Sequence, residues 1–302
     1  MFPCKDKNEI AEAASFAGQA GEESLKLAPE VSTGESAAKA RPPSEAPLLE
    51  AKGIVKYFGA ITALRDVNFR LYRGEVLGVV GDNGAGKSTL MKILSGLYAP
   101  SQGEIIFDGR PVQFASPKDA RRIGIEMVYQ DFALAGNLPI FENIYLGREP
   151  GRRIFGLNIV DLAKARSMAA EHLERLKIHV KSVEQPVEEL SGGQRQAVAI
   201  ARSTAFDARL VIMDEPTAAL AVKEVGKVLD LIRGLKDHGV SVILISHRMD
   251  DIFYVCDRVM ALYHGANFAE APLSETNRNE VIGWIMGTRG HQSGLAHDRV
   301  HG

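Results

Sequence analysis

Short apolar runs recur along the chain at the spacing expected of a sheet whose strands are joined by helices. Val76–Val80, Leu210–Met213 and Val242–Ile245 are continuous apolar runs, which is typical of strands buried on both faces. Between the last two runs, Lys223–Asp237 has the spacing of an amphipathic helix. This alternation predicts a mostly parallel sheet with crossover helices.

Other runs predict strands with one solvent-facing side. Ile54–Phe58 and Val67–Leu71 alternate apolar and polar positions, and Gly103–Phe107 adds another strand before a turn. Because only one side of each is apolar, we expect these strands to be half-buried.

Two further stretches predict helix. Ser116 precedes a proline, so a capping hydroxyl and a proline at the first helical position indicate a helix start. From Met127 to Glu189 the chain is expected to be mainly helical, with an amphipathic helix over Val160–Ile178.

The first buried run leads directly into a glycine-rich segment and then into Leu90–Leu94, which has helical spacing. Strand, glycine-rich loop and helix form the context in which the pattern GxxxxGK[ST] binds phosphate. Glycines let backbone amides surround an anion, and the helix N-terminus adds its positive end. An ordinary glycine-rich turn is the alternative, and the complete pattern argues against it. The predicted nucleotide-binding residues are Gly81, Asp82, Asn83, Gly84, Ala85, Gly86, Lys87, Ser88 and Thr89.

Two side chains of this loop have chemical roles. Lys87 would reach the β- and γ-phosphates of a nucleotide, and the Ser88 hydroxyl would ligate Mg²⁺.

Composition narrows the class of protein. The chain has 302 residues, of which 45% are hydrophobic and 25% charged, as in an ordinary globular protein with a sizeable core. The formal net charge of −2 offers no basic field for nucleic acid. Cys4 and Cys256 form no metal or redox spacing, so a reducing cytosol fits best. No apolar run approaches the roughly 18 residues that cross a bilayer.

The two ends differ from the middle. Residues 1–46 are rich in polar and small residues and are expected to be a disordered leader, because they cannot bury enough apolar surface to offset the entropy of ordering. Residues 288–302 are polar and aperiodic, and we expect a flexible tail. The folded part is therefore predicted to span residues 47–287.

A second motif changes the interpretation from nucleotide binding in general to one family. Ser191-Gly192-Gly193-Gln194 precedes a helical run over Arg195–Thr204, again an amide-rich loop that opens a helix. Taken alone it is weak evidence, but it lies between the phosphate loop and Asp214 in a characteristic order. With the phosphate loop it resembles the nucleotide-binding subunit of ATP-binding-cassette (ABC) proteins, over about Leu48–Met286.

The resemblance assigns further residues. Asp214 and Glu215 follow a buried run and resemble the Walker B pair, in which the aspartate holds the metal and the glutamate polarises the attacking water. Gln130 resembles the Q-loop glutamine, which senses metal and water, and His247 resembles the switch histidine at the γ-phosphate. A surface or capping histidine is the plainer alternative for His247.

The resemblance also leaves one assignment open and contains one departure. Phe58, before a glycine, matches the aromatic that stacks on adenine, with Tyr57 as a shifted alternative and a core residue as the other alternative. Ala221 occupies the position at which the family's D-loop usually has an aspartate that couples two active sites. Hydrolysis stays plausible, while communication between sites is placed in doubt.

The fold implied by the resemblance is an α/β P-loop NTPase cassette. It has a mostly parallel core sheet, an antiparallel β subdomain and a helical subdomain over about residues 131–190. The cofactors implied are ATP and Mg²⁺. Because the phosphate loop and the Ser191–Gln194 loop face different ATPs in the family, the resemblance implies a second cassette, as a homodimer or with a relative.

The partners implied are membrane permease subunits and, indirectly, a periplasmic sugar-binding protein, at the cytoplasmic face of the inner membrane. Five apolar residues after Gln130 are candidates for a groove that receives a permease helix, although some of them will be core. They are Phe132, Leu134, Leu138, Ile140 and Phe141.

Two other classes were weighed. Among soluble cassettes, those of translation factors carry two copies in one chain, and the sequence shows only one set of motifs. Those of DNA repair have a long coiled coil between the two Walker motifs, and the segment from Lys87 to Asp214 has no sustained heptads. A regulatory ATP-binding protein without turnover would need a defective base or switch, whereas Glu215 and His247 are both present.

Finer resemblance indicates the transported solute. The segments Tyr129–Leu134, Glu142–Glu149, Ala218–Leu220 and Ser246–Met249 look like the monosaccharide-importer branch of bacterial cassettes. Many members fuse two cassettes, and disaccharide importers add a C-terminal β domain; this chain is expected to have neither. The resemblance implies uptake of a small sugar, with fructose first and ribose or xylose next.

Overall fold

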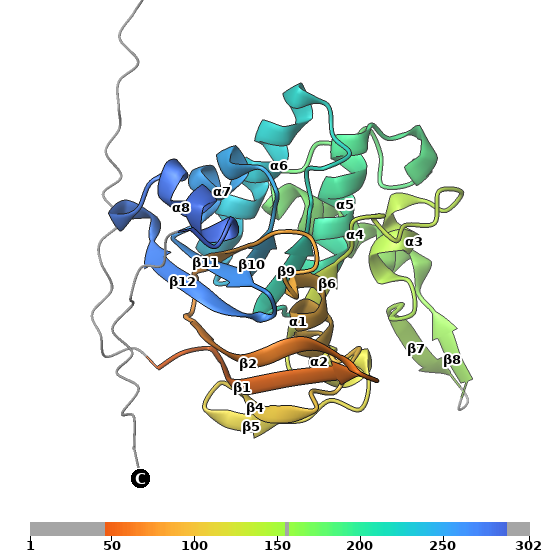
Figure 1. Ribbon diagram of the computed structural model, residues 1–302. Helices are drawn as coiled ribbons and strands as arrows, with labels where there is room; N and C mark the ends of the chain where they lie inside the picture. Colours follow the sequence, from red (N-terminus) through yellow and green to blue (C-terminus); the bar gives the residue numbers. More distant parts are fainter. Residues whose placement is uncertain (1–45, 155–156, 289–302) are drawn as a thin grey trace, which may run out of the picture. The chain divides into compact units, whose positions relative to one another are not determined.

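The structure is a computed structural model, and it describes residues 46–154 and 157–288. The expected leader and tail lie almost entirely outside these residues. Within them, a parallel-stranded sheet, a smaller antiparallel sheet and a set of helices surround the phosphate loop (Figure 1).

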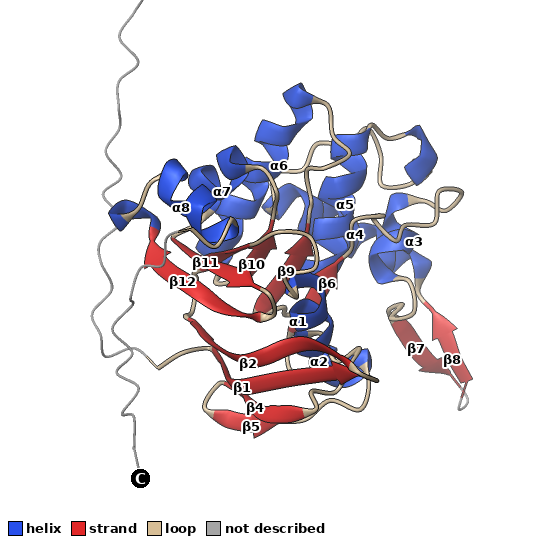
Figure 2. Cartoon of the chain, viewed as in Figure 1, coloured by secondary structure: helices blue, strands red, loops and turns tan. Residues whose placement is uncertain are grey.

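The central sheet of the described residues has the strand order β12-β11-β3-β10-β9-β6 (Figure 2). Its strands are parallel except β12, which pairs with β11 in the antiparallel sense. The mostly parallel core sheet is therefore confirmed. The strands are β3 (Val76–Val80), β6 (Ile125–Val128), β9 (Leu210–Asp214), β10 (Ser241–Ile245), β11 (Arg258–Tyr263) and β12 (Ala266–Pro272).

The second sheet is antiparallel throughout, in the order β2-β1-β4-β5. It confirms the expected antiparallel subdomain, and its strands extend further than the alternation alone indicated. They are β1 (Leu49–Phe58), β2 (Ile61–Leu71), β4 (Gln102–Phe107) and β5 (Arg110–Val112).

Eight α-helices lie within the described residues, and several of them cover the central sheet (Figure 2). They are α1 (Lys87–Leu94), α2 (Pro117–Arg122), α3 (Ile140–Tyr145), α4 (Leu162–Arg175), α5 (Gly192–Thr204), α6 (Val222–Gly234), α7 (Met249–Val255) and α8 (Arg278–Ile285). Short 3-10 helices span Val187–Glu189, Leu235–His238 and Leu273–Glu275, and a hairpin consists of β7 (Gly151–Ile154) and β8 (Leu157–Val160).

The central sheet separates two apolar cores. Along β10, Val242 and Leu244 belong to the core that includes residues of α3 to α8. Ile243 and Ile245 belong to the core that includes residues of α1 and the antiparallel sheet. Alternate side chains of one strand point to opposite faces, so a continuous apolar run is what such a strand requires.

The expected long helix over residues 160–178 is shorter in the structure. Val160 belongs to β8, and α4 starts at Leu162 because Asp161 accepts a hydrogen bond from the backbone N–H of Lys164 at 3.0 Å. The region between Met127 and Glu189 is therefore not only helical, since it also contains the end of β6 and the β7–β8 hairpin.

Candidate active site

Four sequence motifs meet at the carboxyl ends of the parallel strands of the central sheet. The phosphate loop follows β3, His247 follows β10, Asp214 ends β9 and Gln130 follows β6. Ile245 lies beside Val79 on one side and beside Asp214 on the other. Parallel strands place their carboxyl ends together, so residues far apart in sequence converge there, as expected for a ligand site of an open α/β sheet.

Two glycines of the phosphate loop are required by close approaches. A Cβ built on Gly81 would lie 2.4 Å from the carbonyl oxygen of Leu262. One built on Gly86 would lie 2.6 Å from a methyl carbon of Leu64, and Gly86 has φ of +100°. Gly86 is also the N-cap of α1, so the loop turns directly into a helix N-terminus, as the sequence predicted.

The side chain of Lys87 lies against the phosphate loop. Its Nζ donates to the carbonyl oxygens of Gly81 at 2.7 Å and Asp82 at 3.0 Å, and the side chain is buried. Burial lowers the pKa of Lys87, and the carboxylates of Glu215 and Asp214 oppose that shift. The charges of both carboxylates therefore act on this ammonium, and its contact with a phosphate stays a prediction.

The two residues after β9 have different surroundings. Burial, and then the charge of Glu215, raises the pKa of Asp214, while Lys87 lowers it. Glu215 has φ of +50°, and its N–H donates to the carbonyl oxygen of Ile245 at 2.9 Å. This bond holds Glu215 next to the end of β10.

Glu215 and His247 are in direct contact. The Oε1 atom of Glu215 lies 2.6 Å from Nε2 of His247. The His247 side chain is 47% exposed, and its ring faces the carboxylate expected to act as the base, so its role as the switch histidine stays a prediction. A base whose orientation is fixed by a second group is the arrangement that general-base chemistry uses.

Gln130 is exposed, and the backbone just after it is unusual. Phe132 and Ala133 have φ of +61° and +47°, in the left-handed region that side chains disfavour. The guanidinium of Arg202 on α5 donates to the carbonyl oxygen of Ala133 at 2.7 Å. The segment that carries Gln130 is therefore tied to α5.

The aromatic pair before Gly59 lies at the surface. Tyr57 and Phe58 are 46% and 42% exposed, so neither is a core residue. Phe58 contacts the ring of Tyr98 edge to face, with centroids 5.4 Å apart. A stacking face for adenine stays a prediction for Phe58, with Tyr57 as the shifted alternative.

The Ser191–Gln194 loop opens α5 with a reciprocal cap. The N–H of Gln194 donates to Oγ of Ser191 at 3.3 Å, and the N–H of Ser191 donates to Oε1 of Gln194 at 3.2 Å. The helix begins at Gly192, three residues earlier than the expected Arg195, because this capping box includes both glycines in the first turn.

Residues 64–218 match the family model described as "ABC transporter", which is just over half of the chain. The chain belongs to the ABC transporter family. The cassette is an ATPase, and its fold agrees with solved relatives. It superposes on a dimeric ATP-binding cassette in a post-hydrolysis state bound to ADP and Pi with a TM-score of 0.63 and 28% identity, over 74% of this chain and 98% of that one.

Curated relatives of the cassette are similar over most of its length. It is 48% identical to the fructose import ATP-binding protein FrcA of Rhizobium meliloti, over 82% of this chain and 96% of the relative. It is 45% identical to the xylose/arabinose import ATP-binding protein XylG of Sulfolobus acidocaldarius, over 78% and 92%. For the ribose import ATP-binding protein RbsA 2 of Streptomyces avermitilis, at 43% identity, it covers 47% of the relative.

One polar residue of the cassette site could not be found from the sequence. Asp251 on α7 is buried, and its carboxylate accepts hydrogen bonds from the hydroxyls of Thr217 and Ser246, the latter at 3.3 Å. Oγ of Ser246 in turn accepts from the N–H of Arg248 at 3.0 Å. The carboxylate therefore joins the segment after Glu215 to the segment that carries His247.

Magnesium fits the side chains at this edge. Within the described residues no three acidic, histidine or cysteine side chains form a closed metal site. Mg²⁺ bound with a nucleotide usually takes only one or two carboxylates, with phosphate oxygens and water completing the shell. Asp214, whose pKa is raised by burial and by Glu215, is a carboxylate whose charge a divalent cation would stabilise.

Among the residues that the structure describes, no helix is both long enough and apolar enough to cross a bilayer.

Proposed function

We propose that the cassette is the ATP-hydrolysing subunit of a bacterial importer for a monosaccharide, with fructose as the first choice and ribose or xylose next. The similarity to FrcA over nearly the full length of that relative supports this most strongly. The contact between Glu215 and His247 supports turnover in addition to binding.

The family resemblance, together with the contacts of Lys87, Glu215 and His247, supports the following roles in hydrolysis. Glu215 accepts a proton from the attacking water, and His247 holds it in place and contacts the γ-phosphate. Lys87 exchanges its bonds to the loop carbonyls for the β- and γ-phosphates. Asp214, Ser88 and Gln130 would hold Mg²⁺, which would supply positive charge to the same phosphates. Phe58 stacks on the adenine.

A second cassette completes each site in this proposal. The Ser191–Gln194 loop lies at the N-terminus of α5 and would receive the γ-phosphate held by the partner. Two copies would enclose two ATPs, and hydrolysis would let them separate, a two-state arrangement set by the γ-phosphate. A homodimer is our first choice.

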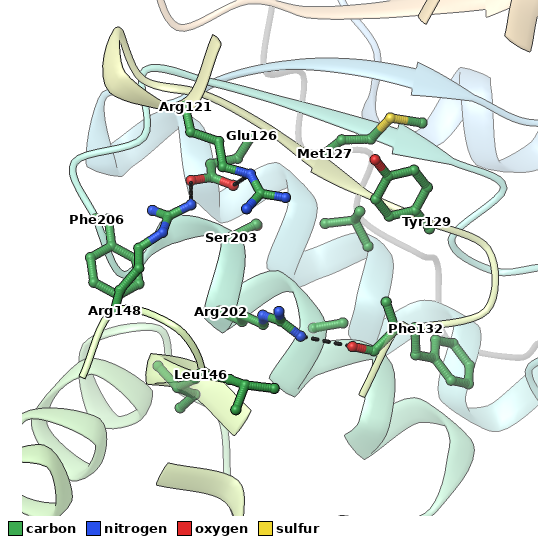
Figure 3. A pocket seen from close by; sticks show the side chains of 14 residues that line it. Arg121, Glu126, Met127, Tyr129, Phe132, Leu146, Arg148, Arg202, Ser203 and Phe206 are labelled. Carbon is green, nitrogen blue, oxygen red and sulfur yellow. Dashed lines mark hydrogen bonds and ion pairs between the residues drawn. The ribbon is translucent and has the colours of Figure 1, made fainter. Parts of the chain in front are cut away.

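The permease contact is proposed for a pocket beside the Gln130 segment (Figure 3). Of the five expected groove residues, Ile140 and Phe141 are core, whereas Phe132 lines the pocket. Most of the other residues that line this pocket were not predicted from the sequence. The other pocket residues include Arg121, Glu126, Met127, Leu146, Arg148, Arg202 and Phe206.

The pocket has more positive than negative side chains. The carboxylate of Glu126 lies 2.6 Å from Arg148 and 3.8 Å from Arg121, and Arg202 adds a third guanidinium to the lining. Burial, and then the charge of Arg121, lowers the pKa of Arg202. A permease helix that presents a carboxylate together with apolar side chains would complement this surface.

Replacing Arg202 by glutamine tests the docking pocket. The amide keeps a donor for the carbonyl of Ala133 but removes the charge, so we expect the permease recovered with the tagged cassette in detergent to fall several-fold. Arg175→Gln, on exposed α4, is the matched control and should recover permease normally. Equal recovery with both variants would place docking elsewhere.

Uptake of labelled sugars tests the proposed function as a whole. Deletion of the gene should abolish uptake of one hexose or pentose, and wild-type cassette should restore it, whereas Glu215→Gln should not. Undiminished uptake of every hexose and pentose, alongside loss of an amino acid or lipid, would instead support an importer for another solute.

A further inference from the structure

The side chain of Glu224 lies directly on the loop that opens α5. Glu224 is in the first turn of α6, which packs against α5. A Cβ built on Gly193 would lie 2.7 Å from Cβ of Glu224 and 3.1 Å from its carboxyl carbon. One built on Gly192 would lie 3.5 Å from Oε2 of Glu224. A side chain at position 193 would therefore clash with Glu224.

The donors of that loop stabilise the carboxylate of Glu224. The Ser191 hydroxyl and the backbone N–H groups of Gly193 and Ala221 all favour its charged form and so lower the pKa of Glu224. The Ser191 bond is the largest of several effects that lower the pKa of Glu224. The oxygen of the Ser191 hydroxyl accepts from the N–H of Gln194, and this leaves the hydroxyl hydrogen available to face Glu224.

These donors are the ones that the proposed dimer needs for the γ-phosphate. A carboxylate and a γ-phosphate are both anionic acceptors, and one hydroxyl with one amide at a helix N-terminus cannot satisfy the two at once. Like charges at this distance also repel. Lys227, three residues along α6, already favours the charged form of Glu224 and offers an alternative partner for a displaced carboxylate.

We propose that Glu224 occupies the phosphate-binding donors of the Ser191–Gln194 loop in the separate subunit and must move away before the partner's ATP can enter. This inference rests on the proposed pairing of two cassettes. Glu224 then sets the ATP concentration at which two subunits close, because closure exchanges an internal carboxylate for the γ-phosphate.

The plainer role for Glu224 is to cap α6 through the N–H of Ala221, and glutamine separates the two roles. Glutamine at this position of a helix retains an acceptor for the cap and loses the charge. The measurement is dimer formation by sedimentation as a function of ATP with Mg²⁺, in full-length chains that carry Glu215→Gln so that hydrolysis does not reopen them.

Adding Glu224→Gln is expected to lower the ATP concentration for half-maximal dimerisation by roughly tenfold, since hydrogen bonds to charged groups are about twice as strong as neutral ones. Glu174→Gln, a remote exposed glutamate on α4, controls for the change in net charge and should leave the curve unchanged.

Two results would overturn the proposal, and they differ. An ATP dependence that Glu224→Gln leaves unchanged or shifts upwards makes Glu224 a cap or a positioning residue, while the pairing of cassettes stands. Failure of the parent Glu215→Gln chain to dimerise with ATP removes the pairing itself, and the competition with it.

Discussion

Lys87→Ala is expected to weaken ATP binding by roughly 10- to 100-fold. The variant loses the ammonium that we propose faces the β- and γ-phosphates, and hydrogen bonds to charged groups contribute about 1.5–3 kcal/mol each. The charges of Glu215 and Asp214 also act on this ammonium and oppose the lowering of its pKa by burial. Titration of a fluorescent ATP analogue measures the change.

Lys118→Ala is the control for that measurement, because it removes the same charge from an exposed position of α2. It should bind as the wild type does. If Lys87→Ala also bound ATP with near-normal affinity while remaining folded, the glycine-rich loop would not be the nucleotide site.

Glu215→Gln is expected to bind ATP but to hydrolyse it about 10²- to 10⁴-fold more slowly, the range that removal of a general base commonly gives. The amide has nearly the same shape and can keep a hydrogen bond to His247, but it cannot accept the proton of the attacking water. Phosphate release measures turnover, and sizing chromatography with Mg²⁺ and ATP should reveal an accumulated dimer.

Glu174→Gln serves as the control here too, because it changes an exposed carboxylate far along α4. It should turn over ATP at the normal rate. Wild-type turnover by Glu215→Gln would remove this residue from its proposed role and would direct attention to another carboxylate at the sheet edge.

Much of the fold and of the nucleotide site could be predicted because the signals are local. A buried strand, a glycine-rich loop and a helix start are contiguous in sequence, so the loop ending at Lys87 was predicted in full. The helix start at Ser116 is equally local: the structure has the expected serine cap with proline at the first helical position, and Asp119 completes a capping box there. The parallel sheet followed from apolar runs such as Val242–Ile245.

What could not be predicted depends on contacts between distant segments. Asp251 is 34 residues from Thr217. It directly follows Asp250, which is exposed, and nothing in the sequence distinguishes the buried aspartate of this pair from the exposed one. The pocket arginines come from α2, the segment after α3, and α5, so no single segment of the sequence indicates that they lie together. Exposure of Phe58 was undecidable, since an alternating strand places an apolar residue equally well in a core or on a surface.

The buried carboxylate of Asp251 has a consequence for how this sequence can diverge. Thr217 and Ser246 both donate to Oδ2 of this carboxylate, and the guanidinium of Arg248 lies 3.4 Å from Oδ1. Removing one hydroxyl leaves the other as a donor to Oδ2, whereas removing both leaves a buried acceptor without either bond, which costs about 1–3 kcal/mol. Replacing all three by apolar residues of similar shape would cost far less. The three side chains are therefore expected to be substituted together: in a descendant that has lost the hydroxyls at both positions 217 and 246, the acid at position 251 should be lost as well.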